Sequence, residues 1–392
     1  MNEYKCAPLR ENVEEMFIGP FGSNLKNECF VDEDDAYCMV YEQKHAIQKT
    51  MDVETRYINE KKYNELKRFN IHGGDIIVSC RGTIGETFIV PENAPLGIMH
   101  PSIMKIRLKD GVYDKYYFNL LLKSRLKQHE AEANGSGVKM AISATELGRE
   151  LFPVPTMQEQ RKITDIIAGI SNVIEKRKQE FSELDNLIKA RFVELFGDVQ
   201  HEEKYKGIQL RELCLTMSGG TPSTKFPEYY EGDIPWISTV SLGPNYIDGT
   251  TAKGYITQEA IDNSTTKLIP AGNILFGTRV GVGKSSLNNV DICTNQDIVA
   301  IVGIDESKFN RLFIKHVLDA YQPYYDSIKK GATILGITGD DLKDTLIPNV
   351  PIETQIEFEK FVNQVDKSKV AVQKALNEAQ QLFDSLMQEY FG

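Results

Sequence analysis

The fold of this chain is decided by residues 163–197, which read ITDIIAGISNVIEKRKQEFSELDNLIKARFVELFG. Apolar side chains recur from Ile163 to Leu195 in steps that alternate four and three residues, and eight of these ten positions are apolar. This is the heptad spacing of helices that pack along one seam. The spacing predicts one helix of about 40 residues, which at about 1.5 Å per residue is about 60 Å long.

The same pattern returns 195 residues later, where Phe391-Gly392 repeats Phe196-Gly197 and Gln355 repeats Gln160. Nine of the ten corresponding seam positions are apolar in this second copy. A repeat period this long indicates a duplicated domain rather than a solenoid. The predicted seam residues are Ile163, Ile167, Ile170, Phe181, Leu184, Ile188, Phe358, Val362, Val365, Leu376, Phe383 and Leu386.

Charged residues interrupt the two seams at different places. Arg177 and Arg191 stand in the first seam and Lys369 in the second, and no charged seam position recurs in both copies. Pairing between the two copies therefore avoids like charges at equivalent positions, whereas pairing of a copy with itself would not. If a two-fold axis perpendicular to the helices relates the copies, the two helices must run antiparallel.

The residues that precede each helix have the pattern of mixed α/β structure. Short β-branched runs bounded by Gly, Pro, Asn and Asp predict strands at residues 75–79, 103–108, 274–276 and 298–302. Helical patterns intervene at residues 114–129 and 308–328. Gly74-Asp75-Ile76-Ile77 and Arg81 recur as Gly272-Asn273-Ile274-Leu275 and Arg279, so the duplication includes these segments.

The sequence therefore predicts an α+β chain of two similar mixed α/β domains and two long antiparallel coiled-coil helices with pseudo-two-fold symmetry. Proline-marked boundaries precede both helices, at residues 152–155 and 347–351. The expected segments are residues 1–156 for the first domain, 157–198 for the first helix, 199–350 for the second domain and 351–392 for the second helix.

The composition indicates an ordinary globular protein of more than one domain, with 392 residues, 41% of them hydrophobic and 26% charged. No apolar run is long enough to span a membrane, and the polar amino terminus lacks the core of a signal peptide, so we expect a cytoplasmic protein. The six cysteines form no C-x-x-C pair and the six histidines show no metal-ligand spacing. We expect reduced, mostly structural cysteines and no metal site.

The formal net charge of −11 argues against DNA binding, because phosphate contacts favour clustered Lys and Arg. The geometry argues the other way. Duplex DNA has a dyad and a helical turn of about 34 Å, and a rod of this length can place two domains in successive major grooves. A long heptad seam is equally compatible with a scaffold that touches no DNA. From the geometry alone, both interpretations remain open.

The order of the motifs resembles that of the DNA-specificity subunits of type I restriction-modification systems, over essentially the whole chain. The second copy carries Ser218-Gly219-Gly220-Thr221-Pro222-Ser223, residues 229–237 (YYEGDIPWI), residues 269–275 (IPAGNIL) and Thr294-Asn295-Gln296. The first copy carries residues 19–25 (GPFGSNL), Gly74-Asp75-Ile76-Ile77 and residues 81–85 (RGTIG). Each motif alone is weak, but their duplicated order is specific.

This resemblance implies two target-recognition domains, each reading one half-site of a bipartite DNA target, with spacer helices that set the gap between the half-sites. It also implies that the helices dock two methyltransferase subunits and, through them, restriction subunits. No cofactor is then expected in this chain, since S-adenosylmethionine, ATP and Mg²⁺ belong to the partner subunits. Partners that hold the same duplex would partly explain the acidic charge. The second helix alone has a net charge of −3, which suits a protein contact better than phosphate.

Two catalytic alternatives find little support in the sequence. An adenine methyltransferase needs an Asn/Asp-Pro-Pro-aromatic loop to hold the flipped base, and the chain contains no Pro-Pro pair. Residues 277–285 (GTRVGVGKS) resemble a phosphate-binding P-loop, but Thr278 stands where that motif requires glycine, and no helix pattern follows. We interpret this segment as a tight turn between strands. A catalytic methyltransferase or nuclease remains the rival class.

Base readout needs Lys, Arg or short polar side chains on loops that can enter the major groove. Arg81 and Arg279 recur in both copies, so a structural or phosphate-contacting role suits them better than specificity. Trp236 and Tyr230 fit a core position as well as a DNA-facing one. The candidate DNA-binding residues are Ser23, Asn24, Lys26, Arg81 and Lys139 in the first copy and Ser218, Thr221, Ser223, Lys225, Arg279 and Thr333 in the second. Lys139 and Thr333 follow turns that we predict at Gly135-Ser136-Gly137 and at Gly331.

Overall fold

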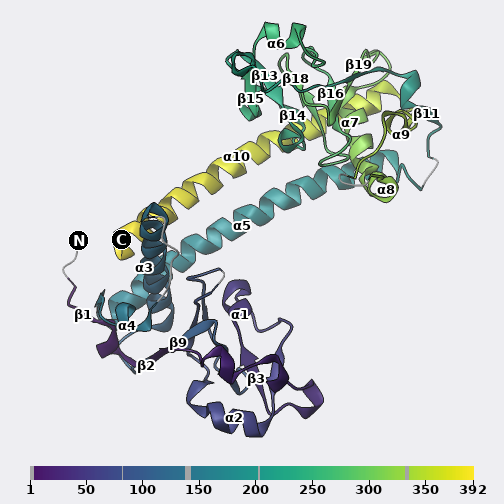
Figure 1. Cartoon of the computed structure of the whole chain (residues 1–392). Coiled ribbons are helices and arrows are strands. Elements are labelled where there is room, and N and C mark those ends of the chain that lie inside the picture. Colours follow the sequence, from purple (N-terminus) through teal and green to yellow (C-terminus); the bar gives the residue numbers. More distant parts are fainter. Residues whose placement is uncertain (1–3, 82, 137–142, 202–203, 332–334) are drawn as a thin grey trace. The chain divides into compact units, whose positions relative to one another are not determined.

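The computed structural model describes residues 4–81, 83–136, 143–201, 204–331 and 335–392. The chain has two long helices, α5 (Met157–Phe196) and α10 (Ile352–Phe391), and two folded units. Each helix has one end in unit 1 and the other end in unit 2. Unit 1 comprises residues 1–178 and 375–392, and unit 2 comprises residues 179–374. The helices and sheets of each unit can be followed in Figure 1.

Unit 1 contains two small sheets and a two-stranded pairing of β1 (Cys6–Pro8) with β10 (Leu151–Pro153). The larger sheet has the order β2 (Val13–Ile18), β9 (Ile103–Leu108), β6 (Ile76–Ser79), β7 (Thr87–Ile89). The smaller sheet has the order β4 (Arg56–Ile58), β3 (Cys38–Tyr41), β8 (Gly97–Met99), β5 (Asn70–Ile71). Its shorter helices are α1 (Gln43–Gln48), α2 (Glu60–Leu66), α3 (Lys115–Ser136) and α4 (Ala144–Leu147).

Unit 2 repeats this plan, with β11 (Gly207–Gln209) paired to β20 (Leu346–Pro348). The larger sheet has the order β12 (Leu215–Ser218), β19 (Ile298–Val302), β16 (Ile274–Gly277), β17 (Ser285–Asn288), β14 (Tyr246–Ile247). The smaller sheet has the order β15 (Gly254–Ile256), β13 (Ile234–Ile237), β18 (Cys293–Thr294). Its shorter helices are α6 (Gln258–Asp262), α7 (Arg311–Ala320), α8 (Gln322–Ile328) and α9 (Gly339–Lys343).

The two units share a common core topology, to which unit 1 adds β5 and unit 2 adds β14. The strand order β2-β9-β6-β7 in unit 1 corresponds to β12-β19-β16-β17 in unit 2, and β4-β3-β8 corresponds to β15-β13-β18. The turn before β6 and the equivalent turn before β16 each contain a glycine in the left-handed conformation, Gly74 at φ 83° and Gly272 at φ 83°. The prediction of two similar mixed α/β domains with two long helices is therefore confirmed.

Within unit 2 the two long helices run antiparallel. Asp185 of α5 pairs with Lys369 of α10 at 2.6 Å, while Arg191, further along α5, pairs with Glu357, which lies earlier in α10. Two of the charged seam residues are thus bonded to the facing helix, and the Lys369 ammonium also lies 4.9 Å from the Phe181 ring centre. Charge at these seam positions is therefore matched across the helix pair.

Several of the predicted seam side chains are buried where a helix end enters a unit. Phe358, Val362, Val365 and Ile188 are buried in the core of unit 2, beside Leu184. Ile163 and Ile167 are buried in the core of unit 1, with Phe383 and Leu386 packed against them. Ile170, Phe181 and Leu376 are half-buried. Phe192, Phe196 and Phe391 are buried as well, although they lie outside the predicted seam set.

A buried glutamine joins each long helix to its unit. Gln160 Oε1 accepts a hydrogen bond from the Asp114 amide at 2.7 Å, and its Nε2 donates to Val112 O and Pro155 O. Gln355 repeats this: its Oε1 accepts from the Asn310 amide at 2.8 Å, and its Nε2 donates to the carbonyls of Lys308 and Val350. With these bonds the donors and the acceptor of the buried side-chain amide all have partners, which offsets the cost of burying it. The repeated glutamine therefore links each long helix to its domain by hydrogen bonds.

Two predicted local features were wrong. The helix expected over residues 114–129 continues to Ser136, so Gly135 and Ser136 lie in α3 rather than in a turn. The favourable Glu-Ala-Glu-Ala run at residues 130–133 extends the helix to its end. The helix expected over residues 308–328 is two helices, α7 and α8, because Pro323 lacks the amide hydrogen that a continuous helix would need there.

Candidate nucleic-acid interface

Three connections of unit 1 leave the same end of its larger sheet. They are residues 19–26 after β2, residues 80–86 between β6 and β7, and residues 100–102 before β9. The amide of Gly19 donates to Ile103 O at 3.0 Å and the amide of Cys80 donates to Ser102 O at 2.8 Å. Because β9 is antiparallel to both neighbours, their ends and its beginning must meet, and the three loops share one surface.

Unit 2 places its loops in the same way. Residues 219–226 follow β12, residues 278–284 join β16 to β17, and residues 295–297 precede β19. The amide of Gly219 donates to Ile298 O at 3.1 Å, and the amide of Thr278 donates to Asp297 O at 2.8 Å. We call these two equivalent surfaces the loop end of each unit.

The first loop of each unit requires glycine because it crosses the third loop closely. A Cβ added at Gly19 would lie 2.2 Å from the carbonyl oxygen of His100, and one added at Gly219 would lie 2.1 Å from that of Asn295. His100 and Asn295 hold equivalent places, each three residues before the corresponding strand β9 or β19. The same backbone contact, of a glycine against a carbonyl oxygen of the third loop, therefore recurs at both loop ends.

The predicted DNA-binding residues of the first loops are exposed at the loop ends. Ser23 and Asn24 belong to a 3₁₀ turn, Gly22–Asn24, and Lys26 follows it, 3.8 Å from Glu28. In unit 2 the exposed set is Ser218, Thr221, Ser223 and Lys225.

The structure also brings candidates from separate loops together in unit 2. Thr221 Oγ1 donates to Gln296 Oε1, and the Arg279 guanidinium lies 3.8 Å from the Asp297 carboxylate, so both meet the third loop. Arg81 is exposed at the equivalent loop of unit 1. Lys139 and Thr333 lie outside the described residues.

Sequence reasoning missed a charged cluster at the loop end of unit 1. Glu42, which is buried, bonds the guanidinium of Arg56 and lies 3.1 Å from the Lys44 ammonium and 4.0 Å from His100 Nε2. Burial alone would raise the pKa of Glu42, but the bonds from Arg56 and Lys44 hold it below its usual value. We call Glu42, Lys44, Arg56 and His100 the Glu42 cluster.

The Glu42 cluster is compatible with an acidic protein that binds DNA locally. Burial lowers the pKa of His100, and the nearby cations Arg56, Arg81 and Lys44 lower it further against the opposing effect of Glu42. Arg56, Arg81 and Lys44, which lie on three separate segments, therefore act on the same side chain at this surface and make it locally positive. No sequence motif marks the cluster, because its members are joined only by the pairing of β3, β4 and β8.

Trp236 and Tyr230 donate hydrogen bonds to the backbone of the first loop of unit 2. The Trp236 ring is buried, and its Nε1 donates to Gly220 O at 3.1 Å. The Tyr230 hydroxyl donates to Pro222 O at 2.7 Å. Both residues position the loop, which favours the core interpretation over direct DNA contact.

The segment that resembles a P-loop is a turn between strands. β16 and β17 pair antiparallel, the Gly277 amide donates to Lys284 O at 2.9 Å, and Gly283 adopts φ 83°. A phosphate-binding loop would lead into a helix, whereas Ser285 begins a strand. The strand-to-strand interpretation is confirmed.

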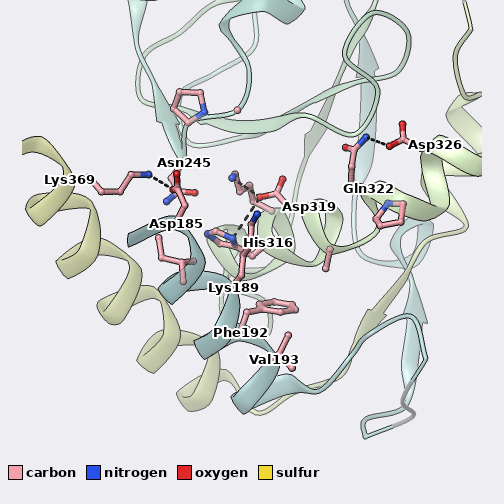
Figure 2. Close-up of a pocket in the computed structure, with 16 residues that line it drawn as sticks. Asp185, Lys189, Phe192, Val193, Asn245, His316, Asp319, Gln322, Asp326 and Lys369 are labelled. Atoms are coloured by element: carbon pink, nitrogen blue, oxygen red, sulfur yellow. Dashed lines mark hydrogen bonds and ion pairs between the residues drawn. The ribbon is translucent and has the colours of Figure 1, made fainter. Parts of the chain in front are cut away.

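A pocket of about 740 Å³, lined by both charged and apolar side chains, lies in unit 2 where α5, α7 and residues 243–245 meet. Figure 2 shows Asp319 and His316 close together on its wall. Lys315 Nζ contacts one Asp319 oxygen at 2.7 Å, and Ser285 Oγ donates to the other at 2.7 Å. Counted from the equivalent helix caps Asn310 and Asp114, the corresponding positions of unit 1 carry Asn119, Leu120 and Lys123. The ion pair of Lys315 with Asp319 therefore has no counterpart in the repeat.

His316 makes unit 2 sensitive to acid. Burial lowers its pKa well below the usual value, and the nearby ammonium groups of Lys315 and Lys369 lower it further. The Asp319 carboxylate, 3.7 Å away, is bonded to Lys315 and Ser285. Below pH about 6.5 the unfolded chain binds a proton that the folded chain does not, so stability falls by up to about 1.4 kcal/mol per pH unit. Segment-resolved hydrogen exchange should show this loss in unit 2 between pH 7.5 and 5.5.

The matched control for this prediction is His316→Leu, which installs the residue found at the equivalent position of unit 1, Leu120. It should remove most of the acid sensitivity of unit 2 while leaving that of unit 1 unchanged. An unaltered pH dependence in this variant would show that another group is responsible.

Within the described residues, no group of three or more His, Cys, Asp or Glu side chains is arranged to hold a metal ion. The six cysteines are free, and burial raises the pKa of Cys80 to about 12, so this thiol stays protonated. No helix in the described part of the chain is long and apolar enough to cross a membrane.

The chain is thus built from a duplicated α/β unit, each copy of which carries a loop end and one end of each long helix. The model of the type I restriction modification DNA specificity domain matches residues 32–185 and again residues 202–380. The chain belongs to this family.

Known proteins agree with this assignment. The chain is 28% identical over 230 residues to the EcoR124I/EcoR124II specificity subunit of Escherichia coli, which is 55% of each protein. It is 28% identical over 159 residues to the MjaIX specificity subunit of Methanocaldococcus jannaschii, or 40% of this chain and 37% of that protein. The chain thus matches less than two thirds of the length of either relative. A chain from a type I R-M system, solved for complex assembly and conformational transition, shares the fold with a TM-score of 0.64 at 16% identity, covering 100% of this chain and 98% of that one.

Proposed function

We propose that this chain reads a bipartite target in double-stranded DNA, one half-site per unit, for a type I restriction-modification complex. The observation that carries the proposal is the duplicated loop end, in which the backbone frame recurs and the exposed side chains differ. Gly19 and Gly219 keep the same close approach, whereas, counted from these glycines, Phe21 corresponds to Thr221 and Lys26 corresponds to Phe226. A constant frame with variable exposed loops suits two readers of different base sequences.

Exposed leucines that recur in the repeat support docking of two copies of one partner. Leu187 on α5 and Leu382 on α10 are equivalent, and they are 48% and 52% exposed. Leu151 on β10 and Leu346 on β20 are a second exposed pair. A single exposed leucine is ordinary, but its recurrence in both copies favours a repeated interface. We infer that two methyltransferase subunits bind these surfaces and connect the chain to restriction subunits.

In this proposal the chain itself catalyses no reaction. The methyltransferase subunits supply S-adenosylmethionine and methyl transfer to adenine, and the restriction subunits supply ATP, Mg²⁺ and cleavage. Its own residues bind and orient the duplex. The complex works where the chromosome is, in the cytoplasm.

The proposal predicts that binding depends on the gap between two half-sites. Mapping methylated adenines in the source genome, with and without this gene, identifies the target. Gel-shift binding of that duplex by the chain with its methyltransferase subunits should then weaken by about tenfold or more when the gap changes by one base pair, because one unit leaves its register in the groove.

A duplex with substitutions only in the gap is the control and should bind like the natural site. Equal binding to all gap lengths would overturn bipartite reading and favour a scaffold. Methyl transfer by the purified chain alone would instead favour the catalytic rival.

A further inference from the structure

The two loop ends carry different chemistry at one equivalent turn. Val40 of β3 pairs with Arg56 and Ile98, and Trp236 of β13 pairs with Gly254 and Cys293. This register makes Arg56 the counterpart of Gly254. Two residues after Val40 and Trp236, Glu42 is the N-cap of α1 and Ser238 is the N-cap of the 3₁₀ turn Thr239–Ser241.

Lys44 and Val240 therefore hold the same position, two residues after the cap. Both turns lie beside the third loop, since the His100 amide donates to Tyr41 O at 2.9 Å and the Asn295 amide donates to Ile237 O at 3.0 Å. We call this equivalent element the cap turn of each unit.

The cap turn of unit 1 presents hydrogen-bond donors in a fixed arrangement. Glu42 is only 7% exposed and cannot itself reach a ligand, but it bonds both cations. The Arg56 guanidinium is also held 4.0 Å from the centre of the Phe30 ring. Arg56 and Lys44 each keep further N–H donors and partly exposed side chains, and fixed donors of this kind match the O6 and N7 acceptors of guanine.

The cap turn of unit 2 presents an apolar side chain instead. Val240 is 84% exposed. Where unit 1 has Arg56, unit 2 has Gly254. At the same loop end, the hairpin turn between β16 and β17 contributes Val280, which is also exposed. An apolar side chain on a groove-facing loop suits the 5-methyl group of thymine. The difference between a cationic and an apolar surface applies only to the cap turns, because the first loop of unit 1 also exposes an apolar side chain, Phe21.

We infer that the cap turns are base-specificity elements, and that Lys44 with Arg56 selects a G·C pair in one half-site while Val240 selects an A·T pair in the other. This inference rests on the proposed function. Glu42 is a positioning residue, because it acts only by orienting the two cations.

The test uses the full chain with its methyltransferase subunits and a pool of duplexes with a randomised central region. The wild type is compared with Lys44→Val and with Val240→Lys. Each substitution should reduce the preference for one base pair by about 5- to 150-fold in its own half-site, and leave the other half-site unchanged. Val290→Lys adds the same charge to unit 2 at the opposite end of β17 and should leave both half-sites unchanged.

Glu42→Gln tests the positioning role. It removes the charge that orients Arg56 and Lys44 but keeps the size of the side chain, so it should weaken the guanine preference while α1 keeps its protection from hydrogen exchange. A guanine preference equal to that of the wild type would overturn this role.

Three outcomes distinguish the inference from the proposed function. Unchanged base preferences in Lys44→Val and Val240→Lys would overturn the inference. An equal loss of affinity for all sequences would also overturn it, because phosphate contacts lower affinity without changing sequence preference. Selection of no bipartite motif by the wild type would overturn the proposed function itself.

Discussion

Replacing Gln355 by leucine should lower the free energy of unfolding of unit 2 by about 3–6 kcal/mol. The substitution leaves the Asn310 amide and the carbonyls of Lys308 and Val350 without their partner, and a buried group left unsatisfied costs about 1–3 kcal/mol. Urea unfolding followed by segment-resolved hydrogen exchange should show early opening of α7 and the first turns of α10.

Two variants control this prediction. Gln364→Leu makes the same change at an exposed position of α10 and should alter stability by less than about 0.5 kcal/mol. Gln160→Leu should weaken unit 1 and spare unit 2, since its bonds go to Asp114, Val112 and Pro155. A Gln355→Leu chain as stable as the wild type would contradict the role assigned to the repeated glutamine.

Replacing Phe196 by alanine should cost unit 2 about 3–5 kcal/mol, the usual effect of removing a buried aromatic ring. Its ring centre lies 4.7 Å from that of Phe313 and 5.4 Å from that of Phe358, so it joins α5, α7 and α10 in one core. The cavity has rigid aromatic walls and cannot collapse fully. Denaturant unfolding with a probe in unit 2 measures the loss.

Phe391→Ala is the equivalent change in unit 1, where the ring lies 5.4 Å from that of Tyr117. It should destabilise unit 1 by a similar amount. Leu187→Ala, at an exposed position of α5, should have little effect on stability. A loss below about 1 kcal/mol for Phe196→Ala would mean that the ends of the long helices do not hold the domain cores together.

The duplication separates residues that build the loop end from residues that vary on it. Gly19 and Gly219, Gln160 and Gln355, and Gly74 and Gly272 recur because each meets the same backbone constraint in both copies. The cap turns differ because nothing in the frame restrains a side chain that points to solvent. A specificity subunit can therefore change its target by substitutions at the loop end while its frame stays constant.

Much of the architecture could be predicted from periodicity and repetition. The heptad seam and the repeated Phe-Gly ends predicted both long helices, and the strands at residues 103–108 and 298–302 have the expected bounds. Phe192 was not predicted to be buried, because it lies one residue from a seam position that carries Arg191. The glycine and serine at the end of α3 were wrongly interpreted as a turn, since local propensity there is overridden by the preceding helix.

The candidate site could be predicted only in part. The loops that contain Ser23, Thr221 and Arg279 were found because they interrupt strands with polar or glycine residues. The Glu42 cluster was not, because Glu42, Arg56 and His100 lie on three segments that meet through strand pairing. Lys139 and Thr333 stay predictions.

The sequence by itself determined the duplication, the two seam helices, the α/β class of each unit and the family resemblance, because periodicity and repetition are properties of residue order. Only the tertiary structure decided which loops share a surface, where charge gathers on an acidic chain, and which exposed positions are equivalent in the two units. These depend on strand register, which brings residues distant in the chain within hydrogen-bond reach and which no local pattern records.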